Sequence, residues 1–96
     1  MKGHSKITVN LYFTNDQEVQ RLNKKWLGRD YSTDVLSFKI DQQISSSKSY
    51  LGDVVVSLPQ AKRNAKKLGH SLEDELVELA THGLRHLLGI HHPGDE

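Results

Sequence analysis

The segment from Ser71 to Leu88 constrains the fold more than any other part of the chain. Ser71 is a typical helix N-cap, and the acidic residues after it favour the positive end of a helix: Glu73, Asp74 and Glu75. Gly89 can end this helix, and Pro93 prevents it from restarting. Apolar residues lie on most of its circumference, so we predict that it is the central, buried helix: Leu72, Leu76, Val77, Leu79, Ala80, Leu84, Leu87 and Leu88.

The N-terminal part of the chain predicts a strand and then a helix. Apolar and polar side chains alternate over Lys6–Phe13, which indicates a half-buried strand. Thr14 and Gln17 have the spacing of a capping box that opens a helix, and Gly28 can end it. Within this helix three residues recur at helical spacing: Val19, Leu22 and Trp26.

The middle of the chain predicts an antiparallel hairpin. Asp34–Ile40 alternates as a strand, Asp41–Ser49 is polar and serine-rich and is expected to be a loop, and Tyr50–Ser57 is a second strand. Three successive valines in the second strand predict burial on both faces of the sheet: Val54, Val55 and Val56.

A further helix follows the hairpin. Ser57 is the expected N-cap, Pro59 lies in the first turn, Gln60 completes a second capping box, and Gly69 ends the helix. The order is therefore strand, helix, strand, strand, helix, helix. We predict one α+β domain over residues 1–96, with a small mixed sheet of about three strands packed against helices.

Composition narrows the chemistry. The 96 residues carry a formal net charge of +1 and no cysteine, so a tightly bound soft metal must use histidine and carboxylate ligands. No apolar run is long enough to span a bilayer, and the first residues do not resemble a signal peptide, so we expect a cytoplasmic protein without membrane contacts.

Histidines at the C-terminal end predict a zinc site. His82 and His86 are four residues apart, which places both imidazoles on one face of the helix. Gly89 lets the chain turn back, and His92 has the favoured spacing for a third ligand, with the adjacent His91 as its competitor. Three nitrogen ligands leave one position open for water, which is typical of a catalytic site holding one Zn²⁺ ion.

The residue after His82 is also informative. A common type of zinc peptidase has a glutamate there as general base, whereas this chain has Gly83. No carboxylate lies between His82 and His92, which disfavours peptide hydrolysis by that mechanism.

Three motifs stand out along the chain. One is His82-Gly83-x-x-His86-Leu87-x-Gly89-x-x-His92. The other two lie upstream: Leu22-Asn23 followed by Thr33-Asp34-Val35-Leu36-Ser37-Phe38, and Leu51-Gly52-Asp53-Val54. Together, in order and approximate spacing, these motifs resemble those of the YbeY family of zinc-dependent, single-strand-specific endoribonucleases over nearly the whole chain.

The resemblance implies a zincin-like metal cleft, a role in rRNA maturation and ribosome quality control, and His82, His86 and His92 as zinc ligands. Two positions depart from the family pattern. Leu27 replaces an arginine that is thought to help catalysis, for which Arg29 is the candidate substitute, and His91 replaces an aspartate. Compared with most members, we expect the chain to lack an N-terminal strand and helix and a C-terminal helix.

Other side chains are candidates for the same chemistry. Arg85 lies inside the histidine motif, where it either binds phosphate or is an ordinary solvated arginine. The catalytic candidates are therefore Arg85, Arg29 and His86. Trp26 and Tyr31 are candidates for base stacking, although the spacing of Trp26 favours the core.

Six basic residues are either a track for the phosphate backbone or an ordinary solvated helix face: Lys24, Lys25, Lys62, Arg63, Lys66 and Lys67. Asp34 and Asp53 either orient the zinc ligands or cap helices and form turns. The resemblance implies that Ser37 lies in the cleft beside the metal.

Three functions follow from these observations. The preferred one is a metal-dependent endoribonuclease that acts on single-stranded RNA, including rRNA. The alternatives are a zinc-dependent peptide or amide hydrolase and a non-catalytic, zinc-stabilised module that binds ribosome-associated proteins. The sequence does not determine the oligomeric state.

Overall fold

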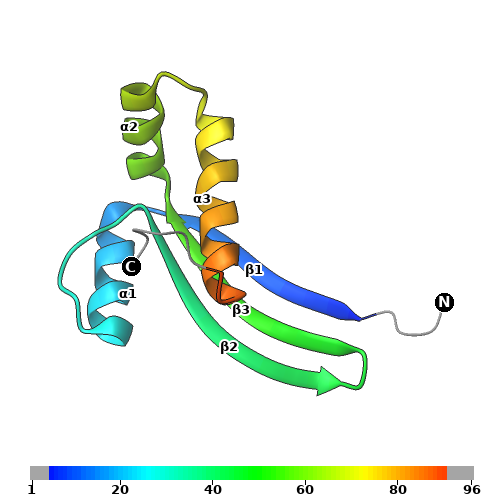
Figure 1. Ribbon diagram of the computed structural model, residues 1–96. Helices are drawn as coiled ribbons and strands as arrows, with labels where there is room; N and C mark the ends of the chain where they lie inside the picture. The colour runs from blue at the N-terminus through cyan, green and yellow to red at the C-terminus, as the bar shows by residue number, and fades with distance from the viewer. Residues whose placement is uncertain (1–4, 91–96) are drawn as a thin grey trace.

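The predicted order of elements is confirmed in a computed structural model, which describes residues 5–90 (Figure 1). Three strands and three helices make an α+β fold with these bounds: β1 Lys6–Thr14, α1 Asp16–Leu27, β2 Val35–Ser45, β3 Lys48–Ser57, α2 Leu58–Leu68 and α3 Leu72–Leu87. No helix within residues 5–90 is long and apolar enough to cross a membrane.

Strand β3 lies at the centre of the sheet, whose order is β1-β3-β2. It pairs in parallel with β1 and antiparallel with β2, so the sheet is mixed as predicted. The valines of β3 are buried on both faces, at 1%, 6% and 0% exposure for Val54, Val55 and Val56. The predicted two-sided burial is therefore confirmed, and it follows from the central position of this strand.

The β2–β3 hairpin is longer than its sequence predicts. The segment expected to be a polar loop is mostly strand, because β2 continues to Ser45 and β3 begins at Lys48. Cross-strand pairs such as Gln43 with Ser49 give these polar residues backbone partners, so the ladder extends without an apolar pattern. Asp41, with φ of 54°, lies within the register shift between Lys39 and Gln42.

Two apolar clusters lie on opposite faces of the sheet. Val54 and Val56 pack with Ala61 of α2 and with Leu79 and Leu87 of α3. Val55 points to the other face, where it packs with Leu36 of β2 and Val19 of α1. Because successive strand residues alternate between faces, the sheet separates α1 from α3.

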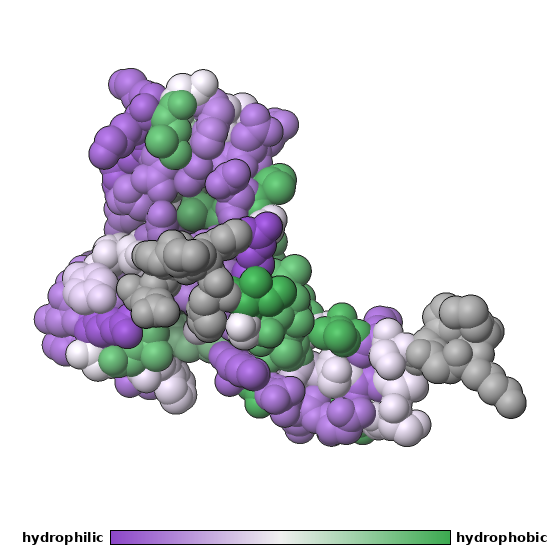
Figure 2. Space-filling model, in the orientation of Figure 1, coloured by the Kyte–Doolittle hydropathy of each residue, from purple (hydrophilic) through white to green (hydrophobic). Residues whose placement is uncertain are grey.

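Helix α3 is not the fully buried helix that its composition predicts. Its buried positions are Glu75, Leu79, Gly83 and Leu87, which form a single stripe. Gly83 and Leu87 face the sheet, whereas Glu75 accepts a hydrogen bond from Asn64 of α2. The apolar residues beside that stripe stay exposed, as Val77 does at 66% and Leu88 at 50%. Figure 2 shows apolar residues gathered where α3 meets the sheet, and a groove of about 560 Å³ lies there between α3 and β1.

Side-chain caps begin all three helices. Ser57 and Ser71 cap α2 and α3 as predicted, but Asn15 rather than Thr14 caps α1 by accepting from the backbone N–H of Glu18. Gln60 donates its backbone N–H to Ser57 Oγ at 3.3 Å, while its side chain bonds to Arg63 and Asn64. The second capping box is therefore only half formed.

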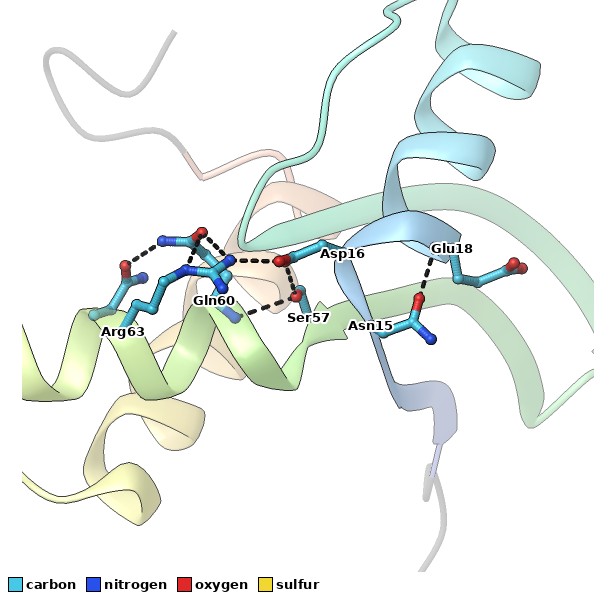
Figure 3. A network of polar contacts seen from close by, with 7 residues as sticks. Asn15, Asp16, Glu18, Ser57, Gln60 and Arg63 are labelled. Atoms are coloured by element: carbon cyan, nitrogen blue, oxygen red, sulfur yellow. Dashed lines mark hydrogen bonds and ion pairs between the residues drawn. The ribbon is translucent and has the colours of Figure 1, made fainter.

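Asp16 joins the first turns of α1 and α2 (Figure 3). Ser57 Oγ donates to Asp16 Oδ1 at 2.5 Å, and an Arg63 guanidinium nitrogen lies 2.5 Å from Asp16 Oδ2. The hydrogen bond from Ser57 and then that from Arg63 lower the pKa of the Asp16 carboxyl. The charge of one residue therefore links two helices that contact each other only slightly.

Asp16→Asn is expected to remove an acid-sensitive part of the stability. Because the pKa of Asp16 is lower in the folded state, its contribution is present above the unfolded-state value of about 3.9 and is lost as the pH falls through the folded-state value. The side chain is 35% exposed, so the variant should lose less than about 1 kcal/mol at pH 7. Urea unfolding at pH 7 and pH 2.5 should show that the difference shrinks in acid; an equal difference at both pH values would contradict the assignment.

Candidate functional site

His82 and His86 lie side by side on the last turns of α3. Their ring centroids are 4.9 Å apart, the ring planes are inclined by 57°, and both residues are half-buried. Two imidazoles at this separation can point one nitrogen each at a common ion about 2.0–2.1 Å away. The pair therefore fits two ligands of one zinc ion, and imidazole is a donor that suits zinc.

The predicted third ligand, His92, and its competitor His91 lie outside the described residues. Within residues 5–90, no group of three histidine, cysteine, aspartate or glutamate side chains is placed to hold a metal ion. The structure thus brings together two of the three predicted ligands. The three-ligand set stays a prediction.

Gly83 lets this part of α3 lie very close to the sheet. A Cβ added at Gly83 would be 2.6 Å from Val54 Cγ1 and 3.1 Å from Ser37 Oγ. In addition, Ser37 Oγ donates a hydrogen bond to the Gly83 carbonyl oxygen at 3.1 Å. From the motif alone, Gly83 stands out only because it lacks a carboxylate. An isolated glycine in an apolar helix pattern is, however, a signal for close packing.

The chain leaves α3 at Gly89, as predicted. Gly89 has φ of 75°, in the left-handed region, and its N–H donates to the His86 carbonyl at 3.1 Å. Ile90 N–H donates to the Arg85 carbonyl at 2.9 Å. The histidine pair therefore lies at the negative end of the α3 dipole, which favours a bound cation.

The two arginine candidates lie on different elements. Arg85 is exposed in the last turn of α3, immediately before His86. Arg29 is exposed in the connection after α1, where its N–H donates to the Asn23 carbonyl at 3.2 Å. Asn23 is 1% exposed and holds the same connection by donating its side-chain amide to the Tyr31 carbonyl at 2.9 Å.

The candidate aspartates take part in other contacts. Asp34 Oδ2 accepts from Asn64 at 3.1 Å, and Asn64 also donates to the buried Glu75 at 3.1 Å. Asp53 accepts a hydrogen bond from the Tyr50 hydroxyl, which raises the pKa of Tyr50. These contacts support the alternative in which the aspartates order turns and strands.

The basic track is divided between two helices. Arg63 on α2 pairs with Asp16, while its neighbours Lys62, Lys66 and Lys67 are exposed. On α1, Lys24 lies 3.7 Å from Asp30, and Lys25 lies over the ring of Trp26. The side chain of Trp26 is 63% exposed, so the core position that its spacing favours is wrong.

Comparison with known proteins places these features in a family. A family model described as "Endoribonuclease YbeY" matches residues 1–96. The "Endoribonuclease YbeY" of Gloeobacter violaceus is 46% identical over 95 residues, which are 94% of this chain and 49% of that protein. The protein of the same name from Aquifex aeolicus is 46% identical over 90 residues, which are 94% of this chain and 59% of that protein.

A solved structure shares the fold. The solution structure of TM1509 from Thermotoga maritima superposes with a TM-score of 0.59 at 30% identity, covering 92% of this chain and 55% of that one. The chain spans about half to three fifths of the length of the relatives it matches. Because the family model covers every residue, including the histidine motif, the chain belongs to the YbeY family.

Proposed function

We propose that this chain is a metal-dependent endoribonuclease that cuts single-stranded RNA during cytoplasmic rRNA maturation and ribosome quality control. The observation that carries the proposal is the His82–His86 pair, whose rings are 4.9 Å apart on α3 of a chain in a family named for endoribonuclease activity. His92 is the proposed third ligand of one Zn²⁺ ion.

The histidines and the end of α3 would hold the metal. When bound, zinc supplies a Lewis acid for the charged phosphodiester and lowers the pKa of a coordinated water. Gly83 and Ser37 determine how close α3 lies to the sheet, so they also determine the position of the two imidazoles. The negative end of the helix dipole adds electrostatic support for the cation.

Arginine would position the phosphate. Arg85 adjoins His86 and is exposed, and a guanidinium can bond two phosphate oxygens at once. Leu27 is 43% exposed and has no donor, so it cannot act like the arginine that the family usually has there. Arg29, two residues further along the exposed connection, is the proposed substitute.

Leu27 also favours a second candidate function. A chain that holds zinc but lacks one phosphate-binding group would serve as a zinc-stabilised module that binds ribosome-associated proteins. Peptide or amide hydrolysis has less support, because Gly83 stands where a peptidase would need its glutamate and has no room for a side chain.

Metal removal separates these functions. Zinc-loaded protein is expected to cut a labelled single-stranded RNA and to leave a duplex of the same sequence intact. Treatment with a chelator should abolish cleavage, and added zinc should restore it, because the metal supplies the Lewis acid. Cleavage of a peptide library alone would support the hydrolase alternative, and stoichiometric zinc without any cleavage would support the binding module.

A further inference from the structure

We propose that the groove beside α1 binds unpaired nucleobases of RNA and that Trp26 is its stacking surface. This inference rests on the proposed function, because it says how the single-stranded RNA substrate is bound. The groove has a volume of about 780 Å³ and is open to solvent. Strands from across the sheet and helix α1 line it, chiefly through Tyr12, Leu22, Trp26, Leu27, Phe38 and Val55.

The exposure of Trp26 is the first observation. An indole ring carries a large apolar surface, and a Trp26 residue that is 63% exposed forgoes much of the free energy of burying it. Val19 of the same helix is completely buried, so α1 packs tightly against the sheet. The exposure of Trp26 is therefore not a result of loose packing of α1. An exposed aromatic side chain at the edge of a groove is suited to stacking with a ligand ring.

The groove offers further ring and apolar surfaces. Tyr12 is 49% exposed on β1, and its register partner on β3 is Val55, which is buried beneath the groove. Phe38 on β2 is half-buried and packs against the cluster of Val19, Leu36 and Val55. The result is an apolar floor with aromatic rings, which is the kind of surface on which bases stack without regard to sequence.

Charge at the groove favours a nucleic acid over an apolar peptide. Lys39 lines the groove, and the ammonium group of Lys25 lies 5.1 Å from the centroid of the Trp26 ring. The two acidic residues of the lining are already bonded. Glu18 holds Arg21 through bonds of 2.9 and 2.5 Å, and Asp53 accepts from the Tyr50 hydroxyl. Lysines beside aromatic rings provide both contacts that a single strand needs, to phosphates and to bases.

Strand β2, at one edge of the sheet, lies between the groove and the histidine-bearing helix. Phe38 of β2 lines the groove on the α1 face, whereas the hydroxyl of its neighbour Ser37 points to the other face, where it donates to the carbonyl of Gly83, next to His82. An RNA strand that stacks on Trp26 can therefore reach the end of α3 by passing around the β2 edge. This arrangement would hold unpaired bases while a neighbouring phosphodiester meets the proposed metal centre.

The test uses Trp26 itself, because it is the only tryptophan in the chain. Chelator-treated protein, which should not cut RNA, is titrated with oligouridylate while tryptophan fluorescence is recorded. We expect saturable quenching by the single strand and little by a duplex or by an uncharged apolar peptide. Anisotropy of labelled oligouridylate should show binding about 5- to 150-fold weaker for Trp26→Ala, the range for loss of one stacked base.

Two variants complete the design. Trp26→Phe keeps a ring and should bind within about threefold of the original chain, since any aromatic face can stack on a base. Val77→Ala shortens an apolar side chain of α3 at a residue that is 66% exposed, close to the 63% of Trp26. This variant should bind RNA as tightly as the original chain. If Trp26→Ala does not fold, the quenching of the unaltered chain still decides the question.

The outcomes separate this inference from the proposed function. RNA binding without quenching, unchanged affinity in Trp26→Ala, or equal quenching by the duplex or by the peptide would overturn the stacking surface, even if zinc-loaded protein cuts RNA. Quenching together with weaker binding by Trp26→Ala supports it, even if zinc-loaded protein cuts nothing and the proposed nuclease activity fails.

Discussion

His86→Ala is expected to lower zinc-dependent cleavage of single-stranded RNA by at least about 100-fold. Groups that merely orient a metal ligand are typically worth about 10- to 100-fold in metal affinity or activity, so loss of a ligand should cost at least the upper figure. His86 lies within 4.9 Å, ring to ring, of His82 and can share one ion with it. The measurements are initial cleavage rates and zinc content after dialysis.

The control for His86→Ala comes from the same helix. Val77→Ala also shortens a side chain of α3, but Val77 is 66% exposed and more than two turns from His86. It should keep both zinc and cleavage. A His86→Ala protein that retains one zinc ion per chain and cuts RNA at the original rate would exclude His86 from the metal centre.

Gly83→Ala is expected to destabilise the fold by about 1–3 kcal/mol, the usual cost of forcing an extra carbon into a packed core. The sign is diagnostic, because glycine-to-alanine changes inside a helix normally stabilise by about 1 kcal/mol. Here the new Cβ would lie 2.6 Å from Val54 Cγ1, and Val54 is 1% exposed at the centre of the sheet. Urea unfolding of both proteins measures the difference.

A double variant identifies the cause. Val54→Ala alone should cost stability by leaving a cavity, but it also removes the methyl groups that Gly83→Ala would meet. The two substitutions together should therefore cost less than the sum of the single ones, with a coupling of about 1 kcal/mol. Thr81→Ala, at an exposed position of α3, should stay within about 0.5 kcal/mol. A stabilised Gly83→Ala protein would show that α3 is not held so close to the sheet.

The sequence predicted features that depend on a few neighbouring residues. Ser57 and Ser71 cap their helices, Gly28 and Gly69 end theirs with φ near 70°, and β2 pairs with β3 as a hairpin. The placement of His82 and His86 on one face of α3 also depends only on neighbouring residues, because four residues make about one helical turn. Each of these depends on backbone geometry within one or two turns of chain.

The candidate site was only partly predictable for the same reason. Helical spacing brings His82 and His86 together, but the role of Gly83 depends on Val54 and Ser37, which lie far away in the chain. Likewise, the sequence placed Trp26 in the core by its spacing from Leu22, whereas the sheet beneath α1 buries Val19 and Asn23 and leaves the ring outside.

Tertiary structure alone decided how far each surface is covered. The composition of α3 predicted burial on most sides, yet a single sheet can cover only one stripe of a helix, so Val77 and Leu88 remain exposed. The polar residues around Ser45 became strand because a paired partner satisfied their backbone groups. Local pattern therefore fixed which residues share a face, and packing between distant segments determined which faces are buried, because burial requires a second surface that no local pattern specifies.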